Sequence, residues 1–101
     1  MSFTAPPKVE YDKKVESQTV KAGSMFIIGV TVSGVPNPKV SWFLNDQQIT
    51  ASSTVSIDTT SEYSTLQVKG TTSKEAGKYK VVAENKVGTD SAEFTVSVMG
   101  E

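Results

Sequence analysis

Residues 75–85, with the sequence EAGKYKVVAEN, carry the strongest structural signal in the chain. From position 78 the residues alternate in character, which places Tyr79, Val81 and Ala83 on one face of an extended strand. Gly77 stands just before this strand, where it permits the close approach of another segment. Beyond the strand, residues 85–88 have Asn and Gly where a tight hairpin requires positive φ. The stretch therefore predicts a half-buried β-strand that turns back on itself at residues 85–88.

The rest of the chain divides into short strands of the same alternating kind, separated by Pro, Gly, Asn and Asp residues. The composition agrees, because 14 Val, 12 Thr and 13 Ser against 2 Leu suit strands better than helices. The one helical element expected is a single turn over 73–76. Asn45-Asp46 is a further turn signal. The sequence predicts an all-β chain, with strands over 6–9, 18–21, 24–33, 40–44, 55–57, 64–69, 78–84 and 89–98.

Several classes of function are excluded by the residue types that the chain lacks. It has no His and no Cys, so it lacks the usual imidazole base, thiolate nucleophile and Cys/His zinc ligands, and it has no disulfide. The carboxylates Asp58, Glu62, Asp90 and Glu93 do not have the spacing of a metal-binding loop. We therefore predict that the chain is not an enzyme and has no catalytic, cofactor-binding or metal-binding residue and no cofactor.

Charge and hydropathy exclude two classes of partner. All ten basic residues are Lys, and the formal net charge is −1, so the chain has neither the Arg fork that reads phosphates nor the positive field that nucleic acids require. No apolar run approaches the length needed to cross a membrane. We expect no nucleic-acid partner and no membrane partner.

Four groups of landmark residues follow one another along the chain. They are Gly34-x-Pro36-x-Pro38-x-Val40-x-Trp42, Leu66-x-Val68, residues 75–79 and Ala83-x-Asn85-x-x-Gly88. In this order and spacing they resemble the intermediate-set (I-set) immunoglobulin domains of giant muscle proteins such as titin and twitchin, with obscurin-like and palladin-like parents also open. The resemblance implies an immunoglobulin-like Greek-key β-sandwich over residues 6–98. Residues 1–5 and 99–101 are then a tail and a linker to neighbouring domains.

The resemblance also assigns the structural core, which comprises Val30, Trp42, Leu66, Tyr79 and Val81. Trp42 fills the middle of the sandwich, and the Tyr79 hydroxyl is expected to bond to backbone in the preceding loop. Aligned on the family pattern, Val30 and Val81 occupy the positions of its two core cysteines, so the resemblance implies an I-set domain without the core disulfide. That bond would contribute about 4 kcal/mol on the chain-entropy model, whereas each buried valine returns about 1.5 kcal/mol or more. Glu75 stands where Asp is usual, which leaves its loop hydrogen bonds open.

The function implied by the resemblance is structural. We expect a mechanically resistant spacer in a tandem immunoglobulin array of a large cytoplasmic protein of the muscle sarcomere, with neighbouring immunoglobulin or fibronectin domains as partners. The isolated domain is expected to be monomeric. A kinase domain elsewhere in such a parent is compatible with this expectation. A cell-surface adhesion domain is a less favoured alternative, because the chain lacks cysteines and Asn-x-Ser/Thr acceptors.

A docking module for actin or another sarcomeric protein is the main alternative. The parity of the strands points Phe43 and Val82 outward beside Lys80, so these three residues form a candidate partner-binding surface. The lysines at 74, 78, 80 and 86 fall near one another around one strand and its flanking loops, and a basic stripe of this kind could meet an acidic filament surface. The alternative interpretation of both features is an ordinary solvent-exposed surface without a partner.

Overall fold

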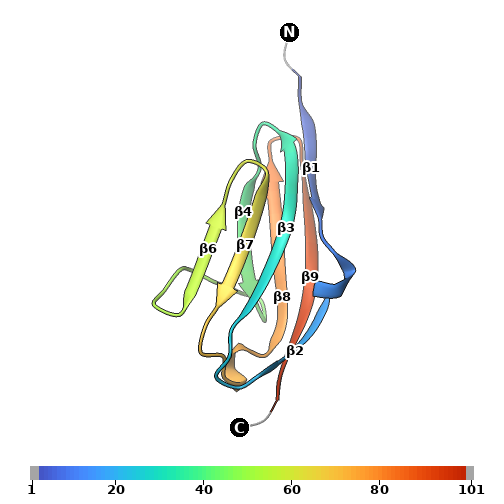
Figure 1. The fold of residues 1–101 in the computed structure, drawn as a ribbon. Helices are drawn as coiled ribbons and strands as arrows, with labels where there is room; N and C mark the ends of the chain where they lie inside the picture. The colour runs from blue at the N-terminus through green and yellow to red at the C-terminus, as the bar shows by residue number, and fades with distance from the viewer. Residues whose placement is uncertain (1–2, 100–101) are drawn as a thin grey trace.

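Nine strands and two short 3-10 helices form within residues 3–99, the part of the chain that the computed structural model describes (Figure 1). The elements are β1 (Ala5–Glu10), η1 (Lys13–Val15), β2 (Ser17–Lys21), β3 (Phe26–Val35), β4 (Lys39–Leu44), β5 (Gln47–Gln48), β6 (Val55–Thr59), β7 (Tyr63–Val68), η2 (Ser73–Glu75), β8 (Gly77–Asn85) and β9 (Gly88–Met99). Residues 1, 2, 100 and 101 belong to the predicted tail and linker and lie outside the described residues.

The strands form two packed sheets. One has the order β1-β3-β7-β6 and the other the order β2-β9-β8-β4-β5. Neighbouring strands are antiparallel except for β2 and β9, which run parallel. Figure 1 shows the chain ends at opposite ends of an elongated body with extents of 57 × 26 × 20 Å. The all-β sandwich predicted from the sequence is confirmed.

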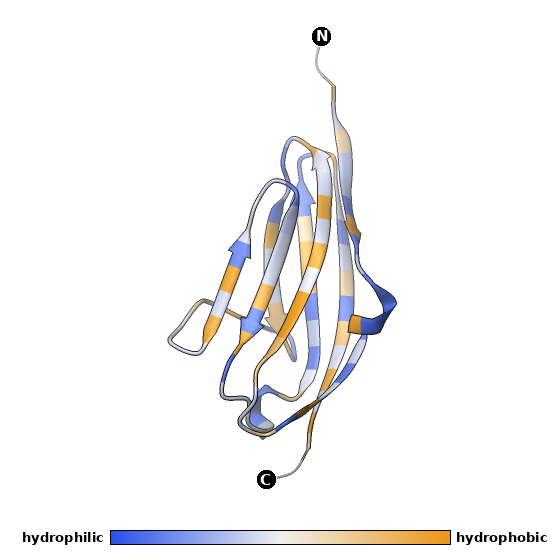
Figure 2. Ribbon diagram, viewed as in Figure 1, coloured by the Kyte–Doolittle hydropathy of each residue, from blue (hydrophilic) through white to orange (hydrophobic). Residues whose placement is uncertain are grey.

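The core lies between the two sheets and is filled by one face of each strand. Figure 2 shows strongly hydrophobic residues alternating with less hydrophobic ones along β6 and along β3 after its hydrophobic start, as the period of two requires. The residues assigned to the core from the sequence, Val30, Trp42, Leu66, Tyr79 and Val81, are all at most 4% exposed. They pack with the remaining buried apolar side chains, Val9, Phe26, Ile28, Val32, Val68, Ala83, Ala92, Phe94 and Val96.

The sequence predicted positive φ in the turn at residues 85–88, but the structure has it in the turn between β4 and β5. Positive φ occurs at Asn45 (50°) and Asp46 (70°), which connect β4 to β5 in a two-residue turn. At residues 85–88 the prediction of positive φ was wrong, since neither Asn85 nor Gly88 lies in that region. The Asn85 side chain closes this turn instead, because its Oδ1 accepts hydrogen bonds from the backbone N–H groups of Val87 (2.9 Å) and Gly88 (3.1 Å).

The N-terminal segment belongs to both sheets, a feature that the sequence did not reveal. β1 pairs with β3, and after Glu10 the chain crosses to the other sheet, where β2 pairs with β9. The crossing is held by Tyr11, whose ring lies edge-on against Phe94 with centroids 4.9 Å apart. Asp12 then starts η1, as its Oδ1 accepts a hydrogen bond from the N–H of Lys14 (2.9 Å).

Candidate functional site

The strands that attach the chain ends form the part of the structure on which an end-to-end load acts. β1 pairs with the C-terminal half of β3, and its register runs from Ala5 opposite Val35 to Glu10 opposite Thr31. β2 runs alongside β9 from Ser17 opposite Thr95 to Lys21 opposite Met99. The ladder continues at both ends, because Thr95 N–H donates to Glu16 (2.7 Å) and Ala22 N–H donates to Met99 (3.1 Å). The β2–β9 ladder is therefore a continuous row of backbone hydrogen bonds, whereas the β1–β3 pairing is interrupted by a register shift between Ala5 and Lys8.

Asn85 ties together the end of the molecule at which the chain enters. Its Nδ2 donates to the carbonyl oxygens of Ala5 (2.9 Å) and Pro36 (3.0 Å). Together with the two bonds that its Oδ1 accepts, this amide joins β1, the β3–β4 loop and the β8–β9 turn. The Asn85 signal in the sequence was read only as a turn, because a side chain's distant partners do not appear in local sequence.

A tyrosine corner forms at the opposite end, before β8. The Tyr79 hydroxyl donates to the backbone carbonyl of Glu75 (2.6 Å), the bond expected from the sequence. The Glu75 carboxylate also has its loop partners, because Oε1 accepts from the Thr72 N–H (2.7 Å) and the Thr72 hydroxyl (2.8 Å). Glutamate therefore supplies the loop bonds at this position, and the loop before β8 is held from two directions.

Stability is expected to fall as the pH rises from about 10 to about 12. Burial, with a smaller contribution from the charge of Glu75, raises the pKa of Tyr79 from 10.0 to about 12. The unfolded chain therefore loses its tyrosine proton first, and the stabilisation that is complete below pH 10 disappears as the pH approaches 12. Each pH unit in this window lowers the free energy of unfolding by up to about 1.4 kcal/mol.

The check is urea denaturation across that pH window. Tyr79→Phe should remove this part of the pH dependence, whereas Tyr63→Phe, at a side chain that is 43% exposed, should leave it unchanged. An unfolding free energy of the unsubstituted domain that stays flat over the window would contradict the assignment.

A short row of hydrogen-bonded side chains lies in the core next to Val30, one of the two positions at which the family has a cysteine. The Trp42 Nε1–H donates to the Ser64 hydroxyl (2.9 Å), and that hydroxyl lies 2.9 Å from Thr59 Oγ1. Ser64 is fully buried and stands opposite Val30 in the β3–β7 register. The bond fixes the orientation of the indole, which also stacks against Phe94 with centroids 6.4 Å apart. Sequence analysis did not single out Ser64, although the residue shares its strand face with Leu66 and Val68, because alternation does not indicate the distant Trp42 partner that a buried hydroxyl needs.

Ser64→Ala is expected to lower the free energy of unfolding by about 2 kcal/mol, because it leaves the buried Trp42 N–H without a partner. The comparison variant is Thr59→Val, which removes the outer bond and keeps the bond between Trp42 and Ser64, and it should cost clearly less. Urea denaturation followed by tryptophan fluorescence measures both. Equal losses for the two variants would show that the indole bond is not the dominant contact.

The candidate partner-binding surface lies on the outer face of β4 and β8. The register places Phe43 opposite Lys80, which stands opposite Glu93 of β9, while Val82 stands opposite Ser41. Phe43, Lys80 and Val82 are each half-buried. Beside them lies a polar recess of about 280 Å³, lined by Asn45, Asp46, Lys78, Lys80 and Glu93. The structure thus brings the three predicted residues to one face and adds a mixed-charge recess to it.

The four lysines considered as a basic stripe are not gathered in one place. Lys78 and Lys80 share the outer face of β8, but Lys74 lies in η2 before that strand begins and Lys86 lies in the turn after it ends. The length of β8 therefore separates the outer two lysines, because a strand extends by about 3.3 Å per residue. Lys78 is also paired with Glu93 (Nζ to Oε1, 3.9 Å), which reduces the local positive charge. The four lysines do not constitute one basic surface.

Within residues 3–99, no group of three or more Asp and Glu side chains is arranged to hold a metal ion. No helix in this part of the chain is long and apolar enough to span a membrane.

The comparisons with known proteins agree with this architecture. A sequence model of the immunoglobulin I-set domain matches residues 9–98. The chain is 39% identical to titin of Drosophila melanogaster over 93 residues, which is 92% of the chain and, to the nearest per cent, 0% of that protein. It is 37% identical to "M-protein, striated muscle" of Gallus gallus over 82 residues, 79% of the chain and 6% of that protein.

Among solved structures, a chimeric titin Z1Z2 superposes with a TM-score of 0.88 at 28% identity, over 98% of this chain and 100% of that one. The chain thus spans only a small fraction of its curated relatives, while its fold matches a whole solved chain. The match to the family over residues 9–98, with the sandwich and the tyrosine corner in place, shows that the chain belongs to the immunoglobulin I-set family.

Proposed function

We propose that this I-set domain is a mechanically resistant spacer in a tandem array of domains within a large cytoplasmic protein of the muscle sarcomere. The observation that carries the proposal is the parallel pairing of β2 with β9 between chain ends at opposite ends of the molecule (Figure 1). Its relatives include muscle proteins many times longer than this chain, which supports a role as one unit among many.

The direction of the strands determines how a pulling force acts on them. Tension on the N-terminus pulls β1 and β2 one way along their axes, and tension on the C-terminus pulls β9 the other way. The backbone bonds between parallel strands lie across this direction, so they are loaded together and not one after another. Such a patch resists unfolding kinetically, because several bonds must break in one step.

The end at which the chain enters also offers a contact surface for a preceding domain. Val35 lies opposite Ala5, and the Asn85 side chain joins Ala5 to the turn that contains Val87. Phe3, Val35 and Val87 are 74%, 39% and 44% exposed. Burying such apolar side chains against a neighbouring immunoglobulin or fibronectin domain would be favourable at about 25 cal/mol per Å². This end therefore suits a neighbour in the same chain.

Single-molecule pulling tests the spacer role. The domain is placed in a polyprotein with a helical-bundle reference domain and extended by its termini. We expect its unfolding force to be clearly higher than that of the helical reference, since helices yield without shearing a strand ladder. A force equal to or below the reference would refute the proposal.

Docking of an actin-associated or sarcomeric partner through the outer face of β4 and β8 is the second candidate function. It is favoured by the half-buried aromatic side chain of Phe43 next to Lys80, Val82 and the polar recess, since an aromatic centre with a polar rim is typical of protein interfaces. Phe43→Ser should weaken sedimentation with its filament or partner protein at least about tenfold if this face is used. Thr95→Ser, farther along the same face, is the matched control, and unchanged sedimentation of Phe43→Ser would exclude the face.

A further inference from the structure

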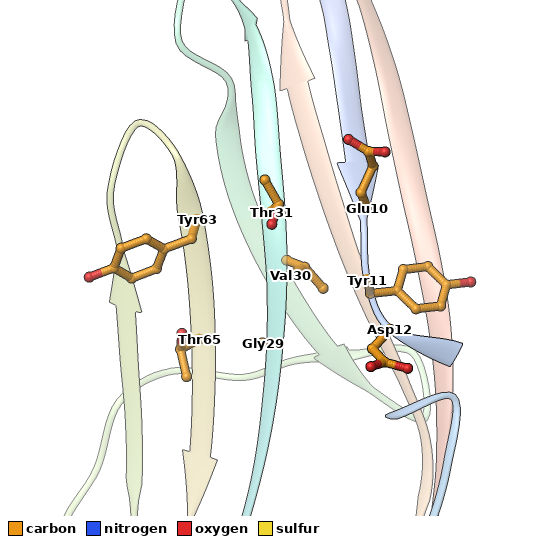
Figure 3. Close-up of a pocket in the computed structure, with 8 residues that line it drawn as sticks. All are labelled: Glu10, Tyr11, Asp12, Gly29, Val30, Thr31, Tyr63 and Thr65. Atoms are coloured by element: carbon orange, nitrogen blue, oxygen red, sulfur yellow. The ribbon is translucent and has the colours of Figure 1, made fainter. Parts of the chain in front are cut away.

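A hollow lies on the opposite sheet, at the place where β1 leaves β3. It measures about 540 Å³ and is open to solvent, and its walls include Gly29, Thr31, Thr65, Tyr63, Glu10 and Asp12. Figure 3 shows Gly29 bare at its centre, with the rings of Tyr63 and Tyr11 turned away to either side. We call this the Gly29 hollow.

The fold itself does not require a glycine at position 29. A Cβ added there would have one near neighbour, the Thr65 hydroxyl oxygen at 3.8 Å, which is an ordinary contact distance. The backbone is not in the positive-φ region either. Glycine in the middle of a strand weakens the strand and leaves its backbone open to close approach by a ligand. The hollow is therefore open because residue 29 is glycine, although the packing around this position would also accept a larger side chain.

On the β1 side of β3, Gly29 is the one residue between Thr31 and Ile27 whose backbone N–H and C=O groups have no partner among the described residues. Val32 N–H donates toward β7, to Glu62 (2.9 Å), so the alternate residues Thr31, Gly29 and Ile27 direct their N–H and C=O groups toward the β1 side. There Thr31 pairs with Glu10, and the Ile27 carbonyl accepts from Gln18 Nε2 (3.4 Å). Within residues 3–99 no such partner reaches Gly29. The gap suits one side chain and is too short for an added strand.

The rim of the hollow carries negative charge. The carboxylates of Glu10 and Asp12 stand on either side of Tyr11, and none of the residues that line the hollow is basic. Tyr11 is anchored against Phe94, and the Asp12 carboxylate is fixed by its bond to Lys14 N–H, so this carboxylate is held before a ligand arrives, whereas the Glu10 side chain is exposed and adds its charge. Lys8 lies 3.8 Å from Glu10, but both side chains are more than 60% exposed, so this pair competes weakly.

We propose that the Gly29 hollow binds an arginine side chain presented by a partner protein. A guanidinium has five N–H donors in one plane, which suits the set of acceptors here, namely the Gly29 carbonyl and the Glu10 and Asp12 carboxylates. Its aliphatic stem packs over the uncovered backbone of Gly29. A second copy of this chain cannot supply the ligand, because all ten of its basic residues are Lys. The site lies away from β4 and β8 and is independent of the spacer role.

The test is an NMR titration of the ¹⁵N-labelled domain with the acetylated, amidated pentapeptide Gly-Ser-Arg-Ser-Gly. We expect saturable shifts of the Gly29, Thr31 and Thr65 amide signals, with a Kd of about 1 mM for such a short probe. The same peptide with citrulline, which is neutral and nearly isosteric with arginine, should bind at least about tenfold more weakly. A lysine peptide should fall between the two.

Two kinds of variant separate the site from non-specific attraction. Gly29→Val closes the hollow and should abolish the shifts while the domain stays folded. The double variant Glu10→Gln with Asp12→Asn keeps the shape and the cap of η1 and should weaken binding at least about fivefold. Glu16→Gln with Glu84→Gln, at two exposed positions that do not line the hollow, also removes two charges and is the control for net charge; it should change nothing. Absence of saturable shifts up to about 10 mM, equal binding of the citrulline or lysine peptide, or retained binding by Gly29→Val would overturn the proposal.

Discussion

Gly77→Ala is expected to lower the free energy of unfolding by about 3 kcal/mol or more, although residue 77 is not part of the hydrophobic core. Gly77 has a φ of 145°, a conformation that L-residues with a Cβ rarely adopt. A Cβ there would also lie 2.5 Å from Asn45 Oδ1. That oxygen is engaged, because it accepts the Lys78 N–H (3.1 Å), so the side chain cannot move aside without losing a bond.

The loss of stability is expected to extend beyond residue 77, because Gly77 lies where the β4–β5 hairpin contacts the start of β8. Asn45 N–H donates to the Lys78 carbonyl (2.9 Å), which couples the β4–β5 turn to the start of β8. Gly29→Ala is the matched control, since its new Cβ meets one atom at 3.8 Å and its φ is not positive. Alanine there should leave stability unchanged or raise it by up to about 1 kcal/mol. Urea denaturation distinguishes the two, and equal stability of Gly77→Ala and the unsubstituted domain would contradict the close contact with Asn45.

Val20→Pro is expected to accelerate unfolding under a constant end-to-end force by about 30-fold, which corresponds to about 2 kcal/mol at the barrier. Glu16 and Ala22 both bond to β9 through their backbone groups. Because alternate residues of a strand direct their backbone groups to the same side, Val20 also directs its N–H group to β9. Proline at position 20 removes a donor from the middle of this ladder. Force-clamp spectroscopy of the polyprotein measures the rate directly.

Thr19→Pro provides the control for the conformational effect of proline alone. Its N–H has the opposite parity and faces away from β9, so its loss removes no ladder bond. We expect this variant to unfold within about threefold of the unsubstituted rate. If both proline variants unfold equally fast, the resistance does not arise from the β2–β9 bonds.

Local patterns in the sequence predicted the parts of the structure that depend on neighbouring residues. Alternation placed Val30, Leu66 and Val81 inward, and the resemblance to the family implied that the Tyr79 hydroxyl bonds to backbone of the preceding loop, where the structure shows the Glu75 carbonyl as its partner. In each case the signal lies within a few residues, because strand period and turn geometry are local. The two-residue strand β5 left no such pattern, since it is too short to alternate.

Features that depend on the path of the chain were missed or misjudged. The lysines at 74 and 86 looked close in sequence, but β8 holds them apart as an extended strand. Asn85 was expected to supply backbone freedom, whereas its side chain bonds to Ala5, 80 positions away. The Gly29 hollow exists only because β1 departs from β3 at Glu10, and no residue near Gly29 indicates where a distant strand ends.

Valine at positions 30 and 81 has a consequence for extensibility. A covalent link between these two positions would hold back the enclosed loop after the sheets had separated. Without cysteine the chain has no such stop, so an unfolded domain can extend from Ala5 to Met99, to about 320 Å at the limit of about 3.3–3.6 Å per residue. Folded, the molecule is 57 Å long. Each domain of this kind thus stores about 260 Å, more than four times its folded length, and this length is released only when the load exceeds what the terminal strands resist.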